Sequence, residues 1–265
     1  MNDSTTKPVQ RRFSPHAALA ALGLRVRQLN LFGPIQEQVK IEQKVVKHTP
    51  IQKLYDGFIT ILAGAHGLVE INKRLRNDPA RPQAAFGRGG CAEQSVVQET
   101  LDACTTVNVG QIHQAMDAIY RQHSQGYRHD YAHWQLLDID ITGLPLRCAQ
   151  GKLCGARAAF ASRGEAPPRP YFAAQQMLTQ LNALAHNTIV WARGWLAPHC
   201  PKLRHWGMLR MVRDVFQVSG LLVFDSIHGI SHIWLNQSDP LARGSAVALR
   251  ALLASKHVAV SLGET

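Results

Sequence analysis

The sequence of 265 residues contains few cysteines, few aromatic residues and few acids, and it lacks a long apolar run. Its five cysteines are an odd number without the spacing of a disulfide framework, which indicates a reducing cytoplasm. Because no run of 18 apolar residues is present, we expect no segment to span a membrane. The apolar stretch 17–24 runs straight into Arg25 and Arg27, so we do not interpret it as a signal peptide.

Acidic residues are scarcest in the second half of the chain. Asp and Glu number 18 against 29 Lys and Arg, a formal net charge of +11. Residues 146–213 contain ten Lys and Arg but one acid, Glu165. A block this one-sided favours a polyanion, most commonly nucleic acid, although a solvated basic face without a specific partner is the alternative. The candidate DNA-binding residues from this block are Arg147, Lys152, Arg157, Arg193, Lys202, Arg204, Arg210 and Arg213.

An apolar content of 46% indicates a folded protein, long enough for one large or two modest domains. Apolar spacing predicts helices, with Thr49 and Pro50 starting the first and Arg193-Gly194 closing the longest. Two apolar runs around Gly229 predict a β-hairpin. We expect an N-terminal arm over 1–30 that either folds as one helix or frays, polar helical character over 35–47, and a mobile tail or short strand from Ser255. The predicted helices are 51–62, 68–75, 91–104, 109–122, 172–191, 208–216 and 241–253, and the predicted hairpin strands are 221–224 and 230–234.

Two aspartates lie within an alternating, β-branched run that ends at Gly143 and Pro145. Residues 136–144 therefore predict a strand, with Asp138 and Asp140 on one face and apolar side chains on the other. Two carboxylates on one face of an apolar strand are costly unless a cation meets them, and hard oxygen ligands suit Mg²⁺. An edge strand with two solvated aspartates is the other interpretation.

These segments resemble the DDE transposases of bacterial insertion sequences, which have an RNase H-like catalytic core. The resemblance covers most of 45–145 and 172–255, and it breaks off between these ranges. It includes His48-Thr49-Pro50, Thr60–Gly67, Glu70-Ile71-Asn72, Ala92–Cys104, His123-Ser124, His129-Asp130-Tyr131, Ala174–Leu178 and Leu184–Asn187. It implies an α+β fold, mostly helical, in which a helical region precedes an incomplete RNase H-like core of one strand, a long helix, a hairpin and a helix.

The resemblance also implies a chemistry and a set of partners. Three acidic residues of such enzymes hold two metal ions, roughly 3.5–4 Å apart, that promote phosphoryl displacement on DNA. Asp140-Ile141-Thr142 matches the pattern of the first acid, so Asp140 is the predicted catalytic and Mg²⁺-binding residue and Asp138 the second choice. The implied partner is the double-stranded DNA of transposon ends, and a homodimer stays open. The implied divisions are an arm (1–47), a DNA-binding-like helical region (48–133), the remnant core (134–255) with its junction (146–170), and a tail (256–265).

The other two acids of the family are missing. Between Asp140 and Asp214 the one acid is Glu165, and the neighbouring Gly164 and Pro167-Pro168 do not suit the helix on which the family carries its glutamate. We therefore interpret the chain as a transposase whose catalytic middle is deleted. A non-catalytic DNA-binding remnant, which could inhibit a full-length transposase, and an unfolded product are the alternatives.

Two further patterns could mislead. The outer face of helix 91–104 offers Gln94, Ser95 and Gln98, which could read bases, but it also carries acids that phosphates repel, so a packing helix is favoured. Asp225, at the end of a hairpin strand, is interpreted as a turn residue and not as a catalytic acid.

Overall fold

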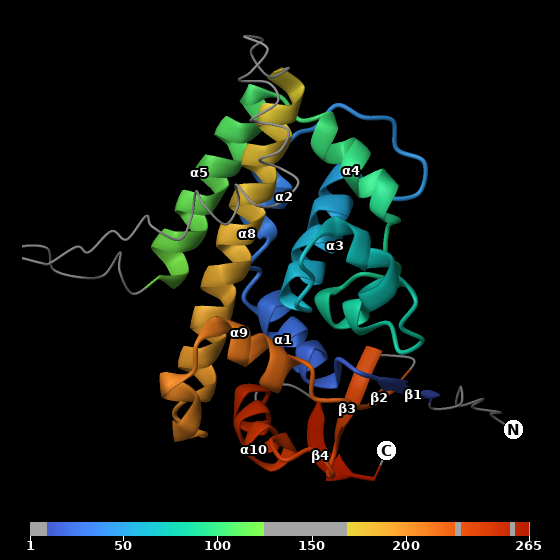
Figure 1. Ribbon diagram of the computed structural model, residues 1–265, viewed down its shortest axis with the longest axis vertical. Helices are drawn as coiled ribbons and strands as arrows, with labels where there is room; N and C mark the ends of the chain where they lie inside the picture. The colour runs from blue at the N-terminus through green and yellow to red at the C-terminus, as the bar shows by residue number, and fades with distance from the viewer. Residues whose placement is uncertain (1–9, 125–168, 226–228, 255–257, 265) are drawn as a thin grey trace, which may run out of the picture.

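The structure is a computed structural model that describes residues 10–124, 169–225, 229–254 and 258–264. Over these residues helices predominate, and a small mixed sheet lies at one end of the molecule (Figure 1). The expected mixed α+β class, mostly helical, is confirmed. The strand predicted at 136–144, on which the RNase H-like interpretation depends, lies outside the described residues.

The sheet of the described residues has four strands in the order β1-β2-β3-β4. The pairs β1–β2 and β2–β3 are antiparallel, and β3–β4 is parallel. The predicted hairpin is confirmed as β2 and β3, with Gly229 at a φ of 80° where β3 begins. The predicted tail contains a strand, β4. The strands are β1 (Gln10–Ser14), β2 (Gly220–Asp225), β3 (Gly229–Asn236) and β4 (Ala259–Gly263).

The helices predicted over 51–62, 91–104, 109–122, 172–191 and 241–253 are confirmed with small shifts of their ends. The helices predicted over 68–75 and 208–216 are corrected: the first is a 3₁₀ turn followed by a π turn, and the second is a short α turn followed by a π turn. The helices are α1 (Ala17–Gln28), α2 (Gly33–Gln38), α3 (Pro50–Leu62), α4 (Gln94–Asp102), α5 (Thr106–His123), α8 (Arg169–Leu196), α9 (Met208–Arg210) and α10 (Ala242–Leu252). The shorter turns are η1 (Leu68–Glu70), η2 (Asn72–Arg76), η3 (Pro82–Phe86), η5 (Pro201–His205) and η6 (Met211–Phe216).

The first predicted helix begins where its sequence indicates. Thr49 caps α3: its hydroxyl accepts from the Gln52 backbone N–H, and the Gln52 side chain accepts from the Thr49 backbone N–H. Pro50 occupies the first turn, where no backbone donor is needed. This reciprocal cap supports the turn that carries Lys53 and Asp56 into the interior.

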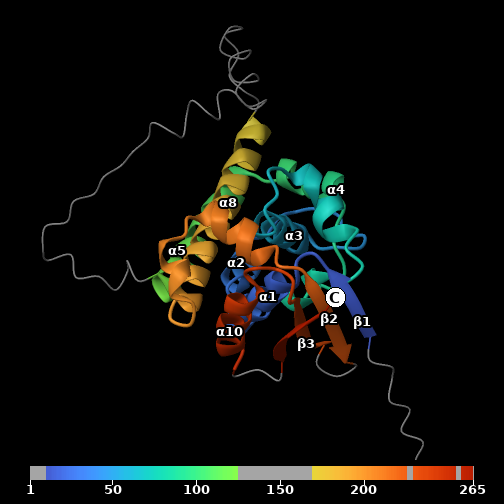
Figure 2. The ribbon, with the colours of Figure 1, turned by 60° about the horizontal axis from the view of Figure 1, so that its bottom comes forward.

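Helix α8 forms the axis of the helical part. It packs against α3, α4 and α5; α5 lies along one side of it and α3 and α4 on the other (Figures 1 and 2). Its buried face includes Met177, Leu181, Leu184 and Ile189. The helix does not close at the predicted Arg193-Gly194, because Leu196 is also buried and keeps the last turn against the core.

The N-terminal segment differs most from its prediction. The expected arm contains β1, which pairs with β2, and α1, which lies between the sheet and the helices (Figure 1). Residues 17–22 are at most 1% exposed. A helix that is apolar on all sides is stable only when it is enclosed, so the Ala/Leu stretch is an internal element of the core.

The polar segment 35–47 is helical only as far as Gln38. Val39 itself is extended, regular secondary structure is absent from 39 to 49, and Val39 and Ile41 are buried. Two side chains of α5 satisfy this backbone, because Gln111 accepts from the Lys40 N–H and Asn108 donates to the Lys40 carbonyl. Hydrogen bonds to side chains of α5 thus replace, at Lys40, the local backbone hydrogen bonds that a helix would make.

Helix α10 confirms the last predicted helix, with one correction. Asp239 accepts from the Leu241 N–H just before the helix, and Leu249 is buried. The apolar spacing of this helix, Leu241, Val247, Leu249 and Leu252, predicts that Val247 faces the core, but Val247 is 53% exposed. Among the described helices, none has the length and apolar character needed to cross a membrane.

Candidate nucleic-acid interface

The predicted catalytic aspartates cannot be placed. Asp138 and Asp140, and with them Arg147, Lys152 and Arg157, lie outside the described residues. Within the described part of the chain, no three His, Cys, Asp or Glu side chains form a group that could hold a metal ion. The Mg²⁺ site implied by the resemblance therefore stays a prediction, and no chemical step is derived through it.

The remaining predicted DNA-binding residues gather around the end of α8. Lys202 and Arg204 are exposed on η5, Arg210 ends α9, and Arg213 follows in η6. The side chains of Arg210 and Arg213 are 55% and 73% exposed. We call residues 201–213 the basic segment. Its four cations reach solvent on one continuous stretch of chain, as a contact with phosphates requires.

Arg193 has a different position from the other four. It is half-buried on α8, and its guanidinium donates to the Trp206 carbonyl at 2.9 Å. Trp206 and Leu203 are buried beneath the basic segment. Arg193 therefore holds the basic segment against α8, and this hydrogen bond makes it a positioning residue.

Trp206 also supports one of the exposed cations. The guanidinium of Arg210 lies 4.0 Å from the centroid of the Trp206 ring, a cation–π contact. A stacked guanidinium keeps its edge donors directed outward, which suits hydrogen bonds to phosphate. The buried Trp206 ring thus restricts the conformations of the Arg210 side chain in the absence of a partner.

One carboxylate partly neutralises the basic segment. Asp214 accepts from Arg210 at 3.2 Å and from Arg213 at 2.6 Å. The hydrogen bond from Arg213 is the main reason that the pKa of Asp214 is lower than usual. Asp214 is the residue directly after the charge block taken from the sequence, so the block looked more one-sided than the folded surface is.

Helix α4 has the features of a packing helix. Val97, Thr100 and Leu101 are buried, and α4 packs against α3 and α8. Of its possible base-reading side chains, Gln98 is only half-exposed and donates to Asp102. These contacts favour packing over base recognition, in line with the interpretation preferred from the sequence.

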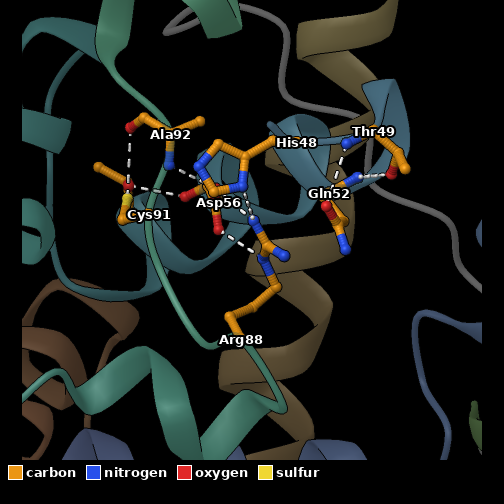
Figure 3. A network of polar contacts seen from close by, with 8 residues as sticks. His48, Thr49, Gln52, Asp56, Arg88, Cys91 and Ala92 are labelled. Carbon is orange, nitrogen blue, oxygen red and sulfur yellow. Dashed lines mark hydrogen bonds and ion pairs between the residues drawn. The ribbon is translucent and has the colours of Figure 1, made fainter. Parts of the chain in front are cut away.

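A buried ion pair joins Asp56 to Arg88 (Figure 3). The carboxylate of Asp56 accepts two hydrogen bonds from Arg88, both at 2.9 Å, and a third from the Ala92 N–H at 2.8 Å. The Asp56 and Arg88 side chains are 0% and 7% exposed. Because α3 carries Asp56, the pair ties the loop 87–93 to that helix.

His48 completes this network from the other side. Its Nδ1 lies 3.4 Å from the Arg88 guanidinium (Figure 3). Burial, followed by the positive charge of Arg88, lowers the pKa of His48. The neutral ring is the form that can accept a hydrogen bond from Arg88.

A pocket of about 350 Å³ opens beside His48 between the segment 43–48, the start of α3 and α4. We call it the lysine pocket, because Lys44, Lys47 and Lys53 line it. Cys91 also lines it, and burial raises the pKa of its thiol to about 12, so the thiol stays protonated. The sequence interpretation missed this pocket. The cluster of lysines at 40, 44, 47 and 53 was its only signal.

Comparisons with known proteins do not assign a family: no protein-family model, no curated protein and no solved structure matches the chain.

Proposed function

We propose that this chain is a transposase-family protein of the bacterial insertion-sequence type that binds transposon-end DNA and has an incomplete catalytic centre. The proposal includes its RNase H-like lineage, its place in the cytoplasm and double-stranded DNA as its partner. The observation that carries the DNA-binding part is the exposure of the basic segment, where four cations face solvent beside one carboxylate.

The geometry supports this binding in two ways. Arg193 and Trp206 fix the basic segment to α8, so little ordering is needed when a phosphate backbone binds. Asp214 orients Arg210 and Arg213 without enclosing them, because both side chains stay more than half exposed. Contacts of this kind position DNA but do not read its sequence.

The binding test measures the affinity of the full chain for a terminal-repeat duplex over a salt series, by fluorescence anisotropy. We expect a steep loss of affinity with salt. In the triple variant Lys202→Ala, Arg204→Ala and Arg210→Ala, the slope of log K against log salt should become shallower by roughly 0.9 for each lost phosphate contact. An unchanged slope contradicts the proposal.

A matched control removes three exposed cations elsewhere: Arg11, Lys40 and Arg121. This variant has the same net charge as the first, so it separates local contacts from the overall field of the protein. Equal losses of affinity in both triple variants would mean that net charge, and not the basic segment, drives binding.

A second assay tests the incomplete catalytic centre. The duplex is incubated with the protein and Mg²⁺, and we expect binding without nicking. Nicking that depends on Mg²⁺ and disappears in Asp140→Ala would restore the interpretation as a complete enzyme. A broad, non-cooperative thermal melt would instead favour an unfolded product.

A further inference from the structure

The most unusual charge among the described residues is the ammonium group of Lys53. The residue is 5% exposed and lies on α3 with its side chain at the wall of the lysine pocket. Within the described part of the chain, its one hydrogen-bond partner is the neutral Oε1 of Gln43 at 3.0 Å. An ammonium group has three donors, so two are left to face the pocket.

Gln43 cannot offset this charge further. Its Oε1 carries no net charge, and it also lies 2.7 Å from the Thr100 hydroxyl, which can donate its one proton to this oxygen or to the Val96 carbonyl. A buried ammonium is costly without a negative partner. Asp56, the nearest buried carboxylate on α3, is already occupied by Arg88 and the Ala92 N–H.

The field at the pocket is positive from several sides. The charges of Arg88, Lys47 and Lys53 all act to lower the pKa of His48, and only Asp56 raises it. Two carboxylates line the same pocket: Glu93, which pairs with Arg76 at 3.1 Å, and Glu99. The positive charges of Lys44, Lys47 and Lys53 therefore outnumber the one negative charge, that of Glu99, which Arg76 does not neutralise.

We propose that the lysine pocket binds a phosphate group, held by the buried Lys53 with Lys44 and Lys47 at the mouth. A phosphate oxygen can accept the two remaining Lys53 donors, and the neutral His48 ring offers one more N–H. The pocket is large enough for a phosphate with an attached sugar. The phosphate could belong to a DNA backbone or to a free phosphate compound, and this inference does not rest on the proposed function.

The test measures binding of inorganic phosphate, adenosine 5′-monophosphate and a DNA duplex to the full chain by calorimetry at constant ionic strength. Lys53→Met keeps the length of the side chain and removes its charge. We expect at least a tenfold loss of phosphate affinity in this variant, and a thermal midpoint in chloride that does not fall. Lys40→Ala, an exposed lysine of the preceding segment, is the matched control and should bind as the parent does.

Glu99→Gln should change the phosphate affinity in the opposite direction from Lys53→Met. It removes the carboxylate that repels a bound anion, so phosphate should bind several-fold more tightly. Phosphate binding should also raise the pKa of His48, measured from its ring proton shifts. A lysine that only packs would produce neither effect. Equal phosphate affinity in the parent, Lys53→Met and Glu99→Gln, or no saturable binding of inorganic phosphate and of adenosine 5′-monophosphate, overturns the proposal.

Comparison of the three probes also identifies the source of the phosphate. If phosphate competes with the duplex and Lys53→Met weakens both, the pocket receives a DNA phosphate. If Lys53→Met weakens only phosphate and the mononucleotide, the pocket serves a free compound. The triple variant of the basic segment should keep its phosphate affinity, which separates failure of this inference from failure of the proposed function.

Discussion

The ion pair between Asp56 and Arg88 gives the sharpest prediction on stability. In Asp56→Ala the guanidinium of Arg88 stays buried without its carboxylate, and the Ala92 N–H loses its acceptor. Breaking a buried pair from one side costs about 3–5 kcal/mol. We expect a loss of this size in the free energy of unfolding, measured by urea denaturation.

A double-mutant cycle tests the physical reason for that loss. Arg88→Met alone leaves the Asp56 carboxylate buried and should be similarly destabilising. In Asp56→Ala with Arg88→Met both charges are gone, so the double variant should be more stable than either single one. Losses that simply add would show that the two charges are not coupled, and the reasoning would be refuted.

An exposed pair provides the control. On α5 the guanidinium Nη2 of Arg121 lies 2.7 Å from the carboxylate Oδ2 of Asp117, but the two side chains are 70% and 43% exposed. Solvent screens such a pair, so Arg121→Ala should cost less than about 1 kcal/mol. If Arg121→Ala and Asp56→Ala cost the same, burial is not the cause of the difference that we expect.

Two further predictions concern pH and backbone conformation. Burial, helped by the charge of Arg74, lowers the pKa of His16 to about 4, so the unfolded state binds this proton first. Stability should therefore fall by up to roughly 3 kcal/mol between pH 6.5 and 4, and an equally steep loss in His16→Phe would contradict this. Gly64 has a φ of 84° and a Cβ there would lie 2.7 Å from Val212, so Gly64→Ala should cost more than about 1 kcal/mol in urea denaturation. Gly67→Ala, in open space, should cost less than about 0.5 kcal/mol, and equal losses would disprove the steric reason.

Local signals in the sequence predicted the helices and the hairpin well. The cap at Thr49 and Pro50 lies within one turn of the helix that it starts, and the apolar spacing of α3 and α5 repeats along the same helix. The hairpin strands β2 and β3 are separated by only a few residues. Each of these features can be recognised without knowing where the rest of the chain lies.

Contacts between distant segments could not be predicted in this way. Strand β1 lacks alternation and forms because β2, more than 200 residues later, offers its edge. The partners Asp56 and Arg88 are 32 residues apart, and neither lies in a recognisable motif. The same reason explains why Lys53, one of the few polar residues on α3, did not by itself indicate a binding pocket.

The two groups of cations differ in how strongly salt acts on them. The basic segment is exposed, so ions within a Debye length of about 8–10 Å screen its attraction for phosphates. Lys53 is buried, and ions cannot approach it as closely. Affinity that disappears as salt rises therefore belongs to the basic segment, while phosphate affinity that persists belongs to the lysine pocket. A salt series on the parent and on Lys53→Met separates the two sites because their burial, and not their charge, distinguishes them.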